Sequence, residues 1–255
     1  MQQGEIVYHQ FETWTDITHG VFTRKGGVSQ SPWASLNVGG NVGDDPQAVR
    51  RNHELMYAAL GISEARACTV WQVHSADVVI ANGPVHGRRW LALADAMITD
   101  KADTPLSMRF ADCTPLLFHD PVQGVIGMAH AGWRGTVTGV GARTVQTMVA
   151  AFGCKPANIR AGIGPSIGPA RYQVGEEVVR AVYDHFGTIE GLVNYDPQDG
   201  TAYLDLWAAN AHDLRAAGVE QIEVSGICTA SHTDEFYSHR AEKGKTGRFG
   251  ALLTL

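Results

Sequence analysis

The sequence predicts an α+β protein, in which strands and helices mix without the regular strand–helix–strand alternation of a doubly wound sheet. Two apolar runs, residues 115–118 and 125–129, flank the segment 120–124 (DPVQG), whose proline and glycine are turn residues. This arrangement is typical of a β-hairpin, and the apolar character of both runs places the hairpin in the core. No repeat, heptad or linker divides the chain, so we expect a single domain over residues 1–255.

The composition indicates a globular protein whose partners are neither nucleic acids nor membranes. Hydrophobic residues make up 44% of the chain and charged residues 18%, and the net charge of −6 comes without a basic stripe. We find neither the basic and apolar regions of a signal peptide nor an apolar run of membrane-spanning length. The four cysteines are scattered without a CxxC pair, which favours the reduced thiols of the cytoplasm. We expect a cytoplasmic protein and leave its oligomeric state open, a monomer included.

The remaining elements follow from local patterns. Asp45 and Pro46 combine an N-cap residue with proline at the first helical position, which predicts a helix that begins there. Helices are expected over residues 46–60, 136–152, 175–186 and 204–217. Strands are expected over 69–80 with a break near His74, over 90–99, from 161 into a tight loop at 164–169, over 221–228 and over 248–255. The polar run 241–247 is interpreted as a mobile loop.

A glycine-rich turn near the N-terminus, residues 20–29, carries two neighbouring cations. Its free backbone N–H groups and Arg24 could bind an anion, because arginine can grip a phosphate with two parallel hydrogen bonds. A surface hairpin with solvated charges is the competing interpretation, and the spacing of a P-loop is absent. The segment 35–45 is too polar and glycine-rich for a regular element, which is typical of a functional or disordered loop.

One register of the predicted hairpin brings a thiol and an imidazole together. If Asp120 faces Val125, Cys113 lies opposite Gly132, and His130 is a diagonal neighbour on the same face as Cys113. The competing interpretation is a small core cysteine and a buried, hydrogen-bonded histidine, because a slip of one residue would separate the two faces.

A thiolate and two imidazoles form a good zinc site, with the fourth position left open for water or substrate. The hairpin supplies two of these donors, and His74, at an apparent strand end, is the best candidate among eleven histidines for the third. Asp112 precedes Cys113 and could either orient a metal ligand or cap a turn. Asp95, within the apolar run 90–99, could be catalytic or could cap a strand-to-loop junction.

Two residues directly after the hairpin suit a purine-like or phosphorylated ligand. Trp133 could stack on a base, and Arg134, where the hairpin leads into a helix, could bind a phosphate. Both side chains have an equally ordinary structural interpretation.

Eight runs in this order resemble the YfiH family: TRKGGVS, SLNVGGNVGDDP, WQVH, ADAMIT, ADCTPLLFHD, GMAHAGWRG, IGPSIG and CTASHTDEFYSHR. The resemblance spans residues 20–253. Its most specific part is ADC, followed seventeen residues later by the histidine of HAGWRG. This family was once labelled multicopper polyphenol oxidoreductase, or laccase-like, and is also named peptidoglycan editing factor.

The resemblance implies a mixed α/β domain of the CNF1/YfiH-like type, with a central hairpin that carries the site. It also implies a purine nucleoside phosphorylase that acts on adenosine, inosine and methylthioadenosine and deaminates adenosine. The family's zinc ligands correspond to His74, Cys113 and His130, which would also be the catalytic residues. Ser75 stands where glycine is common after QVH, a departure that bears on the local shape of the loop.

We therefore expect phosphorolysis, in which phosphate displaces the base at C1′ of the ribose through a cation-like transition state. Arg24 is the candidate phosphate ligand, Asn37 a candidate polar contact to substrate, and Arg134 a further substrate-binding residue. Zinc could position a phosphate oxygen or activate water for attack at C6 of adenosine. The familiar signature of nucleobase deaminases is absent, so any deamination would use a different site architecture.

Three other functions compete with this one. Copper is less expected than zinc, because four-copper oxidases need paired histidines and no His-x-His occurs in the chain. A cysteine hydrolase could use Cys113 as nucleophile and His130 as base, with Asp95 or Asp112 as the orienting acid. A non-catalytic factor acting in the editing of cell-wall precursors is the third alternative.

Overall fold

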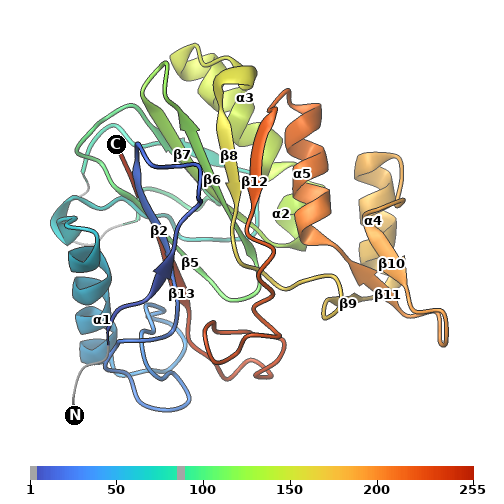
Figure 1. Ribbon diagram of the computed structural model, residues 1–255, viewed down its shortest axis with the longest axis horizontal. Helices are drawn as coiled ribbons and strands as arrows, with labels where there is room; N and C mark the ends of the chain where they lie inside the picture. Colours follow the sequence, from blue (N-terminus) through green and yellow to red (C-terminus); the bar gives the residue numbers. More distant parts are fainter. Residues whose placement is uncertain (1–4, 85–89) are drawn as a thin grey trace.

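The computed structural model describes residues 5–84 and 90–255 and arranges them in four layers (Figure 1). Helix α1 (Pro46–Ala59) covers one face of a four-stranded sheet, whose other face packs on a six-stranded sheet. Helices α3 (Val140–Phe152) and α5 (Leu206–Ala216) cover the far face of the six-stranded sheet. This architecture confirms the predicted α+β class.

The two sheets share one core between them, and each sheet forms a further core with the helices on its outer face. The four-stranded sheet is antiparallel, in the order β1 (Tyr8–His9), β2 (Thr18–Phe22), β13 (Phe249–Thr254) and β5 (Leu106–Phe110). The six-stranded sheet is mixed, in the order β12 (Gln221–Val224), β8 (Arg160–Ile163), β6 (Thr114–Asp120), β7 (Val125–Ala131), β4 (Ala96–Thr99) and β3 (Val78–Ile80). Because side chains alternate along a strand, Leu117 and Met128 face the other sheet, while Leu116 and Ala129 face the helices.

The central hairpin has the predicted register. Asp120 pairs with Val125, and the antiparallel ladder of β6 and β7 continues from there to Thr114 and Ala131. The turn is fixed at both ends: the Asp120 carboxylate accepts hydrogen bonds from the backbone N–H groups of Val122 and Gln123, and Gly124 has a φ of 62°. That positive φ suits glycine, which lacks the Cβ that strains other residues there.

The helices follow the sequence with two differences. Helix α1 begins as predicted, with the Asp45 side chain accepting from the N–H of Gln47. The single helix expected over 136–152 is in fact two, α2 (Trp133–Val137) and α3, because Gly139 adopts a left-handed φ of 73° between them. Helix α5 begins at Leu206 rather than 204, since Asp205 is its N-cap residue.

A third, small sheet was not predicted. It contains β10 (Val193–Tyr195), β11 (Ala202–Leu204) and β9 (Gln173–Val174), and it lies beside α4 (Glu176–Phe186) at one side of the molecule (Figure 1). Strands of two or three residues carry too little alternation to be recognised from sequence. Single 3₁₀ turns occupy Glu64–Arg66 and Pro156–Asn158.

The long strands expected around His74 and Asp95 are shorter than predicted. Of residues 69–80 only β3 is a strand, and of residues 90–99 only β4. Trp71 and Leu93 form an isolated bridge between the two preceding segments. His74 therefore lies in a bend before β3, and Asp95 in a bend directly before β4.

The polar run 241–247 is tied to the rest of the chain rather than free. The Glu242 carboxylate accepts hydrogen bonds from Arg24 Nη1, which lies far away in the sequence, and from the N–H of Ser238 and the hydroxyl of Thr246. Among the described helices, none is both long and apolar enough to cross a membrane.

Candidate metal centre

The predicted trio of His74, Cys113 and His130 comes together in the structure. One donor atom from each residue lies within 4.8 Å of the other two, and the rings of His74 and His130 meet edge to face with centroids 4.9 Å apart. His130 is buried, Cys113 is half-buried and His74 is exposed, so the cluster opens to solvent on the His74 side. No fourth histidine, cysteine or acidic residue of the described chain joins the cluster. A thiolate with two imidazoles and an open position suits a metal ion that also binds substrate or water.

Local structure explains why these three residues meet. Cys113 directly precedes β6 and His130 lies near the end of β7, so the hairpin register places them on one face. His74 has a φ of 62°, an uncommon conformation that turns the chain at the bend. Gly132 makes room for the cluster, because a Cβ there would lie 2.8 Å from Cys113 Sγ and 3.3 Å from His74 Cδ2.

Asp95 is fully buried and contacts both histidine segments. Its Oδ1 accepts a hydrogen bond from His130 Nδ1 at 2.8 Å. Its Oδ2 accepts from the backbone N–H groups of Val73 (3.1 Å) and Ser75 (2.6 Å), and from the Ser75 hydroxyl (3.0 Å). Burial acts to raise the pKa of this carboxyl, but the hydrogen bonds from His130, Ser75 and Val73 lower it below its usual value. Asp95 is therefore an ionised acceptor.

The thiol and imidazole of the cluster shift each other's protonation. Burial acts to raise the pKa of Cys113, but the charge and hydrogen bond of His130, with a further bond from His74, lower it to about 6. Burial acts to lower the pKa of His130, but the Cys113 thiolate and the hydrogen bond to Asp95 raise it to about 9. Both shifts favour the charged pair, a thiolate beside an imidazolium.

Asp112 holds loops together instead of orienting a metal ligand. Its Oδ1 accepts from the Thr229 hydroxyl and its Oδ2 from the backbone N–H of Arg240, both at 2.7 Å. Its backbone carbonyl accepts from the N–H of Ile167. With a φ of 78°, Asp112 turns the chain immediately before Cys113. The carboxylate therefore joins two loops that are distant in the sequence, a role that the sequence analysis did not foresee.

Polar side chains that the sequence analysis did not single out lie around the cluster. Burial raises the pKa of Tyr172, and the charges of Cys113 and Asp112 act in the same direction. Burial lowers the pKa of Arg248, while the charges of Cys113 and Asp112 oppose that shift. The guanidinium of Arg240 lies 5.2 Å from the centre of the Tyr172 ring. Arg248 directly precedes β13 and Tyr172 directly precedes β9, so no local pattern marks either residue.

Arg134 and Trp133 form a pair at the start of α2. The Arg134 guanidinium stacks over the Trp133 ring at 4.2 Å, and its positive charge acts on the Tyr172 hydroxyl. Trp133 is half-buried and packs against the core around α4 and α5. Arg134 therefore covers one face of the Trp133 ring, and the stacking of Trp133 on a base stays a prediction.

Arg24 and Asn37 are both engaged within the protein. Arg24 donates from Nε to the carbonyl of Ala34 and from Nη1 to the carbonyl of Thr233 and the carboxylate of Glu242. Asn37 is fully buried, and its Oδ1 accepts from the backbone N–H groups of Gly39 and Arg248. Asn37 thereby fixes the backbone of Arg248, whose pKa is affected by the charge of Cys113.

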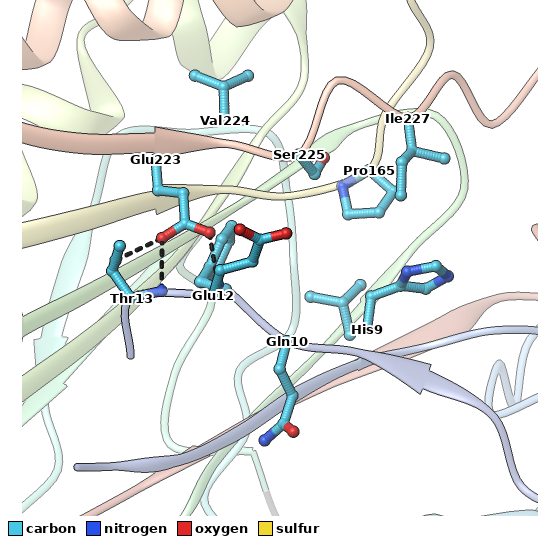
Figure 2. Close-up of a pocket in the computed structure, with 11 residues that line it drawn as sticks. His9, Gln10, Glu12, Thr13, Pro165, Glu223, Val224, Ser225 and Ile227 are labelled. Carbon is cyan, nitrogen blue, oxygen red and sulfur yellow. Dashed lines mark hydrogen bonds between the residues drawn. The ribbon is translucent and has the colours of Figure 1, made fainter. Parts of the chain in front are cut away.

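A separate cavity of about 480 Å³ lies between residues 9–13 of the N-terminal segment and the C-terminal end of β12 with the residues that follow it (Figure 2). The Glu223 carboxylate crosses to the N-terminal segment, where it accepts from the N–H groups of Glu12 and Thr13 and from the Thr13 hydroxyl. None of the three cluster residues lines this cavity.

The fold and the cluster together define a class: a two-sheet α+β protein with a His–Cys–His set that could hold a metal ion at the open end of its central hairpin. The family described as multi-copper polyphenol oxidoreductase laccase matches residues 18–255, and the chain belongs to this family, which includes the YfiH and YlmD proteins.

Relatives and solved structures agree along nearly the whole chain. A purine nucleoside phosphorylase of Deinococcus radiodurans is 40% identical over 239 residues, which cover 94% of this chain and 89% of that protein. The purine nucleoside phosphorylase YlmD of Geobacillus stearothermophilus is 37% identical over 242 residues, covering 92% of this chain and 88% of the relative. The crystal structure of YlmD from that organism superposes with a TM-score of 0.90 at 33% identity, covering 98% of this chain and 99% of the other. The Bacillus licheniformis hypothetical protein YfiH also gives 0.90, at 32% identity, covering 100% of this chain and 97% of that one.

Proposed function

We propose that this protein is a zinc-dependent purine nucleoside phosphorylase that uses inorganic phosphate to cleave adenosine, inosine and methylthioadenosine. Deamination of adenosine is proposed as a side activity. The observation that carries the proposal is the His74–Cys113–His130 cluster, which retains an open position, in a chain whose relatives are named purine nucleoside phosphorylases.

The donor set favours zinc as the resident metal. Three protein ligands with a free fourth position are the usual arrangement of a catalytic zinc site, and a half-buried thiolate is a strong ligand for it. When bound, the ion would act as a Lewis acid toward a phosphate oxygen or a water. The same donors also suit copper, so the metal has to be measured.

Phosphorolysis makes definite demands on the surrounding side chains. A phosphate oxygen forms the new bond to C1′ as the glycosidic C1′–N9 bond breaks, and the base leaves with the electron pair and takes up a proton. The phosphate dianion needs cations that lose little solvation on binding it, and guanidinium groups meet this need. The products are the free purine and a sugar 1-phosphate, which is ribose 1-phosphate from adenosine and inosine and 5-methylthioribose 1-phosphate from methylthioadenosine.

Four residues are proposed to contact or position the substrates. Arg24 remains the proposed phosphate ligand, as the guanidinium of the glycine-rich turn, with its Nε and Nη1 also donating to protein groups. Arg134 is proposed to bind substrate beside Trp133. Arg248 is a second candidate cation, since it lies near enough to Cys113 to sense its charge. Asn37 is proposed to position Arg248, because Asn37 Oδ1 accepts a hydrogen bond from the backbone N–H of Arg248 at 2.8 Å.

The decisive experiment combines metal analysis with a phosphate-dependent assay. Protein purified without chelators is expected to contain one zinc per chain and to release free base and ribose 1-phosphate only when phosphate is present. Release of base without phosphate would instead show hydrolysis, and inosine with ammonia from adenosine would show deamination. Stoichiometric copper, or no metal in active protein, would contradict the proposal.

One observation favours a second candidate, a cysteine hydrolase. Cys113, His130 and Asp95 are hydrogen-bonded in the order thiol, imidazole and carboxylate, which is the order of a nucleophile, its base and an orienting acid. A nucleophilic Cys113 would be alkylated in the native protein, with loss of activity. A metal ligand would be alkylated only after the metal is removed.

A further inference from the structure

The single carboxylate of Asp95 uses its two oxygens on two different parts of the cluster. One fully buried carboxylate contacts one member of the cluster and the two residues that flank a second member, with a different oxygen for each. Its Oδ1 contacts the ring of His130 directly, while its Oδ2 contacts the residues on either side of His74. Cys113, the third member, has no hydrogen bond to Asp95 in the described structure.

We propose that Asp95 is the positioning residue that sets both histidines of the metal centre at once. Oδ1 fixes the ring and tautomer of His130, and Oδ2 holds the bend that carries His74. This inference rests on the metal site of the proposed function, and it adds a role that neither the cluster nor the relatives assign.

The contact to His130 selects its metal-binding form. A carboxylate can only accept, so His130 Nδ1 must carry a hydrogen, which leaves the lone pair on Nε2 for a metal ion. Carboxylate partners of this kind commonly orient histidine ligands and raise their basicity.

The contact to the bend serves His74 in a different way. His74 has a positive φ, which costs free energy for a residue with a Cβ, so the bend needs support from its surroundings. Oδ2 supplies that support by accepting hydrogen bonds from the backbone N–H groups of both Val73 and Ser75. The Ser75 hydroxyl adds a third hydrogen bond, which a glycine at this position would lack.

Asparagine cannot replace both functions. Its one oxygen can serve either His130 or the two backbone N–H groups, while its NH₂ group faces the other side as a donor. If the NH₂ group faces the bend, it meets the backbone N–H groups of Val73 and Ser75, which are also donors, so the bend that carries His74 loses these hydrogen bonds. If it faces His130, the ring must accept at Nδ1, so Nε2 carries the hydrogen and can no longer bind a metal.

The test compares metal affinity in Asp95→Asn, Ser75→Ala and a matched control, Asp213→Asn. Asp213 is also a buried carboxylate that pairs with a histidine, His185, and accepts a backbone N–H, from Ala142, yet it belongs to α5. Zinc affinity is measured by competition with a chromophoric chelator. Cobalt is added to metal-free protein, and its thiolate charge-transfer and d–d bands report the coordination.

Asp95→Asn is expected to bind zinc roughly ten- to a hundredfold more weakly than wild type and to show altered cobalt bands. Ser75→Ala is expected to lose roughly two- to tenfold, the value of one hydrogen bond. Asp213→Asn should lower the melting temperature while leaving zinc affinity and the cobalt spectrum at the wild-type values.

Equal zinc affinities in wild type and Asp95→Asn, or equal losses in Asp95→Asn and Asp213→Asn, would overturn the inference. If Asp95→Asn does not fold, the zinc affinity of Ser75→Ala is the deciding measurement. A wild-type zinc affinity in Ser75→Ala would then overturn the inference. Failure of the wild type to bind zinc or cobalt would overturn the proposed metal site itself. Metal binding without phosphorolysis would contradict only the proposed activity.

Discussion

Arg24 Nη1 donates a hydrogen bond to Glu242 Oε1 at 3.0 Å, which joins two segments more than two hundred residues apart in the chain. The side chain of Arg24 is 15% exposed, and its guanidinium also stacks on the Tyr237 ring at 4.4 Å. The glycine-rich turn near the N-terminus is therefore held against the C-terminal segment that contains residues 241–247. Any phosphate that uses Arg24 must bind at this junction.

Replacing Arg24 with alanine should weaken phosphate use much more than nucleoside binding. Loss of a charge-assisted contact typically costs about 1.5–3 kcal/mol, or roughly ten- to a hundredfold in phosphate kcat/KM. Arg24→Lys should recover little, because an ammonium keeps the charge without the planar fork. Phosphate and nucleoside kinetics are measured for both variants, with thermal unfolding as the measure of lost Glu242 and Tyr237 contacts.

The neighbouring Lys25→Ala is the control for a cation in the same turn, because Lys25 is 42% exposed and pairs with Glu235. Wild-type phosphate kinetics in Arg24→Ala would remove Arg24 from the site and leave Arg248 as the candidate to test next.

Local patterns suffice to predict the central hairpin. The hairpin register follows from its turn, because Asp120 binds the turn's N–H groups and Gly124 supplies the positive φ, so the positions of Cys113 and His130 could be predicted. The local pattern makes His74 only the best candidate among eleven histidines, and the family resemblance is needed to assign it, because its closeness to the hairpin depends on contacts through Asp95.

Other features depend on tertiary contacts that one sequence does not display. The break between α2 and α3 at Gly139 is one, because a glycine near a helix start fits either a continuous or a divided helix. The burial of Arg24 is another. Its partners Ala34, Thr233 and Glu242 lie in three irregular segments, and no periodic pattern connects them.

Cys113→Ala is expected to abolish metal binding and activity while the protein stays folded. The cluster lies at the open end of the hairpin, and the two cores on either side of the six-stranded sheet do not include Cys113. Elemental analysis, circular dichroism and thermal unfolding are the measurements. Cys154→Ala is the matched control: Cys154 is buried in the core, so this variant should lose stability, by about 1 kcal/mol, and keep its metal. A Cys113→Ala protein that cannot be obtained folded would make the site structural.

Alkylation of metal-free protein should report the ionisation of Cys113. The Cys113 pKa is lowered to about 6, so the rate of reaction with iodoacetamide should rise with pH to a plateau near pH 7, well below the usual range for a thiol. Cys154 should not compete, because burial and a hydrogen bond to Asp120 raise its pKa to about 12. Mass spectrometry of peptides gives the rate at each site. Zinc should suppress the labelling of Cys113, and equal labelling with and without zinc would favour the cysteine hydrolase.

Stability should fall in mild acid because of His119. Its Nδ1 accepts a hydrogen bond from Arg160 Nη2 at 2.9 Å, which requires an unprotonated nitrogen. Burial, and then the charge of Arg160, lower the pKa of His119 below 6.5 in the folded protein. The unfolded chain therefore takes up the proton more readily, and the free energy of unfolding decreases as pH falls below about 6.5 toward the folded-state pKa.

His119→Asn keeps an acceptor near the position of Nδ1 but cannot titrate, so its free energy of unfolding should vary less between pH 7 and pH 5. Denaturant unfolding at several pH values measures this slope. His212→Asn, which removes an exposed histidine, should leave the slope as in wild type. Identical slopes in wild type and His119→Asn would show that His119 does not contribute.

The three donors of the cluster come from a bend, a residue before β6 and the strand β7, so they meet only when the sheet has assembled. An ion held by all three would bind the folded chain and have little affinity for the unfolded one. At a free concentration one hundred times its Kd, such an ion stabilises a protein by about 2.7 kcal/mol. Zinc supply would then govern how long each molecule survives. Chains made when zinc is scarce would be unfolded for a larger fraction of the time, and therefore more exposed to proteases, than chains made when zinc is abundant.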